Sequence, residues 1–175
     1  SGTSASSSTF WRGDGTWVAP GGGKILQVVQ TTSASSTLHN TITTYTASAI
    51  SGAITPTAAS SKIFISIFYA SSLYHGPTTL AGGSVKLYRD IEEAAGYAAL
   101  YPSSVGGAQF RTVQSSSTIG ARSTQTLTYL DSPSYTLTDV ITYKIYGAAG
   151  PSGYGNLTTS PDGDSAAVTL MEVAA

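Results

Sequence analysis

Short runs of β-branched and aromatic residues, each closed by a cluster of Gly, Pro, Ser or Asp, recur along this 175-residue chain. The clearest run, KIFISIFYA at 62–70, alternates three isoleucines with Phe64, Ser66 and Phe68. Because alternate residues of a strand point to opposite faces, this run predicts a strand with both faces covered. Further predicted strands combine β-propensity with partial alternation and lie at 24–30, 39–47, 84–90, 124–132, 139–147 and 166–174.

The segments between these runs carry turn chemistry, as in SGAITPTAAS, HGPTTLAGG, GAAGPSGYG and SPDGDS. Seven or more short strands separated by such turns predict an antiparallel sandwich or barrel. Only 89–101 has helical character, because acidic residues stand near its start, but Gly96 interrupts it. We expect a short helical turn there at most.

Charged residues make up 10% of the chain and hydrophobic residues 41%, with a net charge of −1 and no cysteine. An ordinary globular domain is about 25% charged. The near-zero charge provides no electrostatic footprint for nucleic acid or an anionic membrane. The longest apolar run, at 62–70, is too short to span a bilayer, so no membrane insertion is expected. The first residue, Ser1, favours a piece of a longer protein, although removal of an initiator Met leaves the same trace.

Catalytic chemistry has little support in the residues. His39 and His75 stand beside turn-forming residues outside any recognisable motif, which favours a surface or turn role for both. Two close acidic pairs, at 92–93 and at 162 and 164, could support glycoside cleavage only if the carboxylates were suitably spaced. PDGDS at 161–165 resembles the start of a calcium loop but lacks the later glycine and closing glutamate, which favours a turn. We therefore expect no enzyme activity, no metal and no cofactor.

Binding chemistry has more support, because the chain contains 11 tyrosines. Four of them fall in predicted loops: Tyr74, Tyr97, Tyr101 and Tyr154. Tyrosine offers a large, stiff contact surface with a polar tip, which suits recognition of carbohydrates or proteins. The alternative is that these rings pack beneath the loops of the sandwich.

The N-terminal segment differs in composition from the predicted strands. Residues 1–9 are small and polar and read as a linker, whereas FWRGDGTW at 10–17 places an Arg-Gly-Asp tripeptide between two tryptophans. Such a tripeptide is a cell-adhesion signal when a loop tip displays it. Because Trp11 and Trp17 should seek burial, we favour a structural role for the segment over adhesion.

Three stretches, in order, resemble a known family. FWRGDGTW resembles an LRGDGTW-type segment that precedes the C-terminal head of bacteriophage tail-fibre proteins. GGGKILQVVQTT, followed by SAISGAITPTAASSKIFISIFYA, is similar to the start of such heads in marine and cyanobacterial phages. TLTYLDSPSYTLTDVITYKIYGAAG and the closing AAVTLMEVAA resemble their end. The resemblance covers residues 10 to about 70 and 124 to 175, whereas 71–123 has no matching pattern.

The resemblance implies an all-β, antiparallel, jelly-roll-like β-sandwich that forms a homotrimer on a slender stalk. It divides the chain into a stalk and trimer collar at 1–23 and a head at 24–175. Such a protein is made in the cytoplasm of a bacterial host and exposed on the virion. Its expected partner is a host surface glycan or outer-membrane protein, bound for phage attachment. The alternative is a structural trimerisation or decoration module of the virion that binds no receptor.

Two groups of site residues follow from these expectations. Receptor contacts are expected where the chain departs from the family pattern, in the loops 71–78 and 96–110, with candidates Tyr74, His75, Tyr97, Tyr101 and Phe110. The collar is expected to pack three copies around the trimer axis, with Arg12 and Asp14 pairing between chains, and its candidates are Phe10, Trp11, Arg12, Asp14 and Trp17.

Overall fold

The computed structural model describes residues 6, 9–18, 25–41, 44–75, 82–92, 96–101, 108–111, 119–150 and 155–175. In these ranges the regular elements are β-strands and one 3₁₀ turn, η1 (Pro161–Gly163). The strands are β1 (Phe10–Trp11), β2 (Trp17–Val18), β3 (Ile25–Ser33), β4 (Thr37–His39), β5 (Thr46–Ile54), β6 (Lys62–His75), β7 (Gly82–Ile91), β8 (Ala98–Tyr101), β9 (Ala108–Arg111), β10 (Ile119–Asp131), β11 (Ile141–Ala149), β12 (Asn156–Thr159) and β13 (Ala166–Val173).

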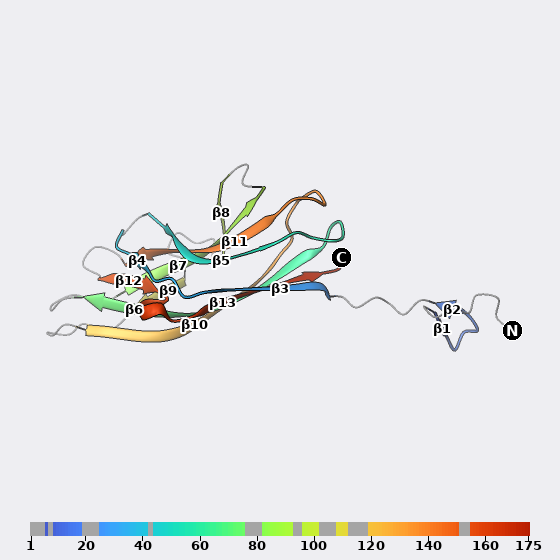
Figure 1. Cartoon of the computed structure of the whole chain (residues 1–175), viewed down its shortest axis with the longest axis horizontal. Coiled ribbons are helices and arrows are strands. Elements are labelled where there is room, and N and C mark those ends of the chain that lie inside the picture. The colour runs from blue at the N-terminus through green and yellow to red at the C-terminus, as the bar shows by residue number, and fades with distance from the viewer. Residues whose placement is uncertain are drawn as a thin grey trace.

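Two antiparallel sheets lie face to face (Figure 1), which confirms the predicted sandwich. In the larger sheet β10 pairs with one edge of β6, while β13 and β12 share its other edge and are flanked by β3 and β4. The smaller sheet runs β5-β11-β7, with β8 and β9 both paired to β7. The order β3-β13-β6-β10 opposite β5-β11-β7-β9 is that of a jelly roll, in which successive strands alternate between two sheets.

The core forms where the alternating apolar residues of both sheets meet. Ile63, Ile65 and Ile67 of β6 have no exposed surface, as their spacing predicted. The other face of the same strand departs from the prediction, because Phe68 is 48% exposed. In a single chain the outer face of the larger sheet is therefore open at this residue.

Other differences from the predicted elements have local causes. Of the predicted strand 39–47, residues 40–41 and 44–45 are not in a strand. Strand β5 begins at Thr46 and continues to Ile54, where Gly52 and Ser48 interrupt the apolar pattern. The four-residue β12 was not predicted. The helical turn expected at 89–101 is wrong for the described residues 89–92 and 96–101, because Ile91 still belongs to β7 and Glu92 adopts a left-handed φ of 57°.

A buried ion pair joins the two sheets. Arg89 of β7 donates through Nη1 to both carboxylate oxygens of Asp131 at the end of β10, at 3.0 and 2.8 Å. The Tyr143 hydroxyl of β11 donates to the same carboxylate at 2.8 Å. Burial, followed by the nearby Asp131 charge, raises the pKa of Tyr143, which keeps its hydroxyl a donor. The Asp131 carboxylate of the larger sheet thus accepts its hydrogen bonds from β7 and β11 of the smaller sheet.

A second buried carboxylate binds the turn between β5 of the smaller sheet and β6 of the larger sheet. Glu172 of β13 has no exposed surface, and it accepts hydrogen bonds from the backbone N–H groups of Thr57 and Ala58, the Thr57 hydroxyl and the Gln27 amide. Burial alone would raise the pKa of Glu172, but these donors outweigh it and lower the value to about 2. The 55–61 turn is therefore anchored to the last strand.

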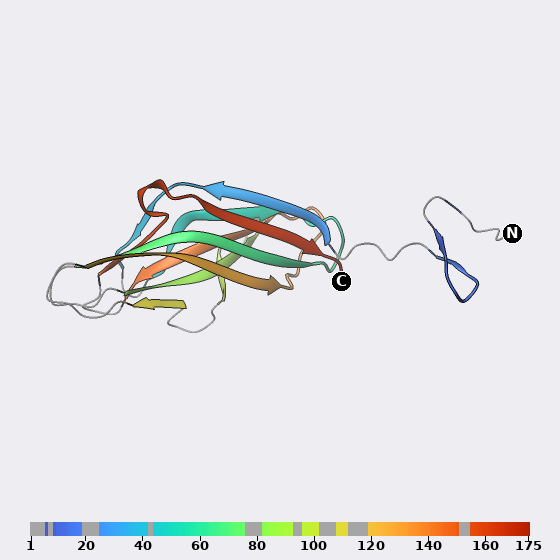
Figure 2. The same ribbon diagram turned by 90° about the horizontal axis from the view of Figure 1, so that it is seen from below.

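The N-terminal hairpin β1–β2 lies beyond one end of the sandwich, which we call the proximal end (Figure 2). Ile25 of β3 and Val173 of β13 pair at this end. The opposite, distal end carries the end of β6, where Tyr74 pairs with Gly120 of β10 and Asn156 of β12. The predicted boundary between residues 23 and 24 lies outside the described residues.

The two sheets approach each other closely where Gly147 of β11 faces His39. A Cβ added at Gly147 would lie 2.6 Å from the imidazole ring, which is buried and cannot withdraw. We therefore expect Gly147→Ala to lower the free energy of unfolding by about 1–3 kcal/mol in urea denaturation. Gly120→Ala is the matched control in β10, because a Cβ added there would have nothing within 4 Å, and its effect should stay within about 0.5 kcal/mol. Equal effects of the two substitutions would contradict the close approach.

Candidate functional site

The Arg-Gly-Asp tripeptide occupies the turn of the β1–β2 hairpin. Gly15 adopts a φ of 84° and donates its N–H to the Arg12 carbonyl at 3.0 Å, while Arg12 donates its N–H to the Thr16 carbonyl at 2.8 Å. Arg12 and Asp14 form an ion pair at 3.4 Å within one chain, with about half of each side chain exposed. The tripeptide is thus displayed at a tip, which its position between two tryptophans did not suggest.

The two tryptophans contact each other across the hairpin. Their ring centroids are 5.5 Å apart in an edge-to-face arrangement, but Trp11 remains 56% exposed. The expected burial of its indole is therefore not met within a single chain. Phe10 pairs with Val18 through the backbone, and its side chain lies outside the described part of the structure. The collar stays a prediction.

His39 is fully buried, so the expected surface or turn role is wrong for this residue. Its ring lies between the sheets, with Nδ1 2.7 Å from the Thr46 hydroxyl and Nε2 3.2 Å from the Thr159 hydroxyl. Desolvation lowers the pKa of His39 to about 4, which keeps the ring neutral near pH 7. Both ring nitrogens are used in packing the fold, and neither faces solvent as a general base would.

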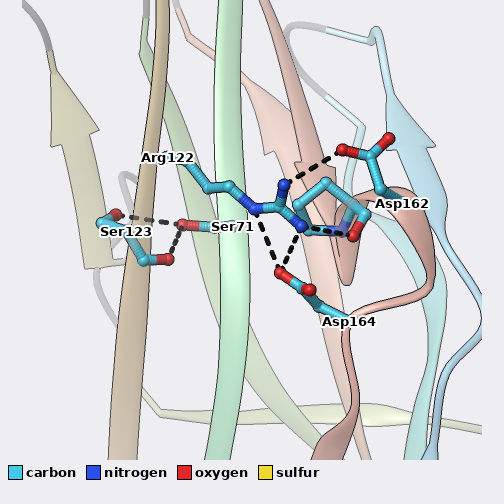
Figure 3. Close-up of polar contacts among 6 residues, drawn as sticks. Ser71, Arg122, Ser123, Asp162 and Asp164 are labelled. Carbon is cyan, nitrogen blue, oxygen red and sulfur yellow. Dashed lines mark hydrogen bonds and ion pairs between the residues drawn. The ribbon is translucent and has the colours of Figure 1, made fainter.

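Figure 3 shows that Arg122 of β10 binds the acidic pair of the PDGDS turn. The guanidinium donates to the Asp162 carboxylate at 3.0 Å, to the Pro161 carbonyl at 2.9 Å and through Nε to Asp164 at 3.0 Å, with a second, shorter bond to Asp164. The prediction of a turn is confirmed as η1. A cation of the chain itself lies where a metal ion would have to bind.

Three of the predicted receptor contacts have described side chains, and these three lie against different neighbours. Tyr74 is 58% exposed at the distal end. Tyr101 of β8 stacks on Tyr129 of β10 at 5.3 Å, whereas Tyr97 contacts a different ring on the smaller sheet. The side chains of His75 and Phe110, and all of Tyr154, lie outside the described part of the structure.

Tyr97 belongs to an aromatic cluster on the outer face of the smaller sheet. Tyr88 of β7 stacks on Tyr146 of β11 with centroids 4.1 Å apart, and Tyr97 lies 5.7 Å from Tyr146. Lys144 of β11 places Nζ 4.8 Å above the Tyr97 ring. We call these four residues, together with Asp90 at the end of β7, the tyrosine face. All four half-buried members can be contacted from solvent.

The outward position of these side chains follows from the strand pairing. Tyr88 pairs with Lys144, and Tyr146 pairs with Lys86, so residues of β7 and β11 alternate between the core and the tyrosine face. Lys86 in turn lies 4.8 Å from the ring centroid of Tyr45, which extends the aromatic surface beyond Tyr146. Sequence reasoning found Tyr97 but missed Tyr88, Tyr146 and Asp90, although the alternation at 84–90 already placed Tyr88 and Lys86 on one face.

Tyr88 and Tyr146 keep their protons near neutral pH. Desolvation, and then the Tyr45 ring, raises the pKa of Tyr88. Desolvation also raises the pKa of Tyr146, with smaller contributions from Tyr97, Tyr88 and Asp90. Each phenol is therefore both donor and acceptor. The face offers ring surface, hydroxyl groups, an ammonium and a carboxylate, which is a set of groups for binding rather than for bond cleavage.

No protein-family model matches the chain, and no curated protein matches it. In the described residues no three His, Asp or Glu side chains gather as metal ligands, and no helix there is long and apolar enough to cross a membrane.

The buried His39 predicts a specific loss of stability in mild acid. The unfolded chain binds a proton at this histidine below about pH 6.5, whereas the folded protein does so only near pH 4. Stability should therefore fall by about 1.4 kcal/mol per pH unit across this window as pH decreases. His39→Gln should remove that slope in urea denaturation between pH 6.5 and 5, above the range where Glu172 titrates. Both proteins retain His75, so equal slopes would contradict the assignment.

Proposed function

We propose that this chain is the attachment head of a bacteriophage tail fibre, which binds a glycan or protein on the surface of a host cell. The observation that carries the proposal is the tyrosine face, where three rings in contact lie on the outer side of a rigid sheet. Aromatic rings with polar tips on a rigid scaffold suit reversible recognition of an extended surface.

The placement of the N-terminal hairpin supports this proposal. An attachment head needs one end for the stalk and other surfaces for the receptor. The hairpin lies beyond the proximal end, and the distal end lies opposite it (Figure 2). The tyrosine face lies on the side of the sandwich, on β7 and β11. The ordered motifs at 10–17, 24–70 and 124–175 support the same assignment. The homotrimer, the virion location and synthesis in a bacterial cytoplasm belong to the proposal.

Binding to cells tests the proposed function. We expect the fluorescently labelled protein to bind a subset of strains in a panel of marine bacteria and cyanobacteria, measured by flow cytometry. Tyr97→Ala should weaken that binding by about fivefold or more, because it removes one ring of the face. Leu137→Ala, a change of an exposed residue in the β10–β11 connection, is the control. Absence of binding to every strain would contradict the attachment function.

A structural trimerisation module is the second candidate, and the outer face of the larger sheet favours it. One row of paired residues across four strands is apolar: Val28, Met171, Phe64 and Leu130. Val28 is 56% and Leu130 49% exposed, and Phe68 lies further along β6 on the same face. On this face, paired residues of β3, β13, β6 and β10 form rows across the sheet. From the row that begins at Val28 to the row that ends at Thr126, no side chain is charged, so identical copies can meet here without like-charge repulsion.

Sedimentation tests the association of copies through this face. The wild-type protein should sediment as a trimer, and the double variant Val28→Ser, Leu130→Ser should shift towards monomer, because each change removes apolar area from the interface. The matched control is Leu137→Ser, which lies on a connection rather than on the face. A wild-type monomer would contradict both candidate functions. A trimer that binds no cell would favour the structural module.

A further inference from the structure

Asp90 holds a carboxylate with unused hydrogen-bonding capacity beside the tyrosine rings. Its side chain lies at the end of β7, opposite Thr142 of β11, and the residue is only 5% exposed. Within the described part of the chain, Oδ1 is buried and has no hydrogen-bond partner. A buried carboxylate oxygen without a donor is costly, and native structures leave few such groups. The other two buried carboxylates discussed above, those of Asp131 and Glu172, both accept hydrogen bonds.

The rings beside Asp90 form a continuous surface. Tyr88 is two residues from Asp90 on the same face of β7, and the Asp90 charge lies close enough to Tyr146 to act on its phenol. Tyr146 contacts both Tyr88 and Tyr97. Pyranose rings have an apolar face that stacks on such surfaces, while their hydroxyls donate to carboxylates.

The aromatic surface lies along β7 between two buried charged residues. Lys86 and Asp90 stand four residues apart on one strand, which corresponds to about 13 Å along β7. Between them lie Tyr88 and its cross-strand neighbour Lys144. The two ammonium groups lie against the Tyr45 and Tyr97 rings at 4.8 Å, whereas Oδ1 of Asp90 has no hydrogen-bond partner.

We infer that the tyrosine face is a binding site for a neutral oligosaccharide, with Asp90 accepting hydrogen bonds from sugar hydroxyls and Tyr88, Tyr97 and Tyr146 stacking against the rings. This inference rests on the proposed attachment function and names its ligand class. A sugar hydroxyl supplies the donor that Oδ1 of Asp90 lacks, whereas an ionised sugar carboxylate offers only acceptors to this oxygen. The site lies on the side of the sandwich, and of the receptor contacts predicted from the sequence it includes Tyr97.

Calorimetric titration with defined sugars tests the inference. The probes are neutral hexasaccharides of glucose, mannose, galactose and N-acetylglucosamine, with tetragalacturonate as the acidic probe. We expect at least one neutral probe to bind, and Asp90→Asn to weaken that binding by about tenfold or more. Tyr146→Ala should weaken sugar binding by a similar factor, because it removes the ring that contacts both Tyr88 and Tyr97. Leu137→Ala, in the β10–β11 connection, is the control and should leave the affinity unchanged.

The stability of the variants separates binding from folding. Asp90→Asn removes the charge of a buried carboxylate whose Oδ1 has no partner, so its melting temperature should not fall below that of the wild type. Failure of every neutral probe, binding of tetragalacturonate alone, or wild-type affinity in Asp90→Asn would overturn the inference.

Binding to whole cells distinguishes failure of this inference from failure of the attachment function. A head that binds cells equally well with Asp90→Asn and Tyr146→Ala retains the proposed function but uses another surface. A head that binds a neutral hexasaccharide through Asp90 but no cell keeps the saccharide site and loses the attachment function.

Discussion

Strand register is the constraint on which this structure depends. With a period of two residues, a slip of one position would exchange the buried and exposed faces of a whole strand. The apolar residues of the core only partly prevent such slips, because isoleucine fits many sites. Asp131, Glu172 and His39 are more selective, since each finds its partners on other strands or turns only in the observed alignment. The few polar groups inside thus specify the pairing that the apolar groups stabilise.

The sequence predicted the sandwich because its strongest runs are also its central strands. At 62–70 and 124–132 the alternation is regular, and its predicted inner residues are buried or half-buried. It failed where small residues replace that pattern, as in β5, in which Gly52 is required by the side chain of Val168 across the core. It also failed for His39, because the partners that accept an imidazole into the core are 7 and 120 residues away along the chain.

The candidate site was only partly predictable for a related reason. Tyr97 could be found because it stands in a Gly-flanked segment that looks like a loop. Tyr88 and Tyr146 lie in strands, and strand tyrosines are commonly core residues. Their contact at 4.1 Å depends on the pairing of β7 with β11, which no local pattern encodes. The unpartnered oxygen of Asp90 could be recognised only once its surroundings were known.

The alternation in β11 has a consequence for how this protein can change. Ile141, Tyr143 and Ile145 are buried without exposed surface, while Lys144 and Tyr146 point to the tyrosine face. Substitutions at the outward positions can alter the ligand preference of the face and leave the core as it is. An inserted or deleted residue in the same strand would interchange the two sets and disrupt both. Diversification of this surface is therefore restricted to substitution in the strands, whereas changes of length are confined to the connections between them.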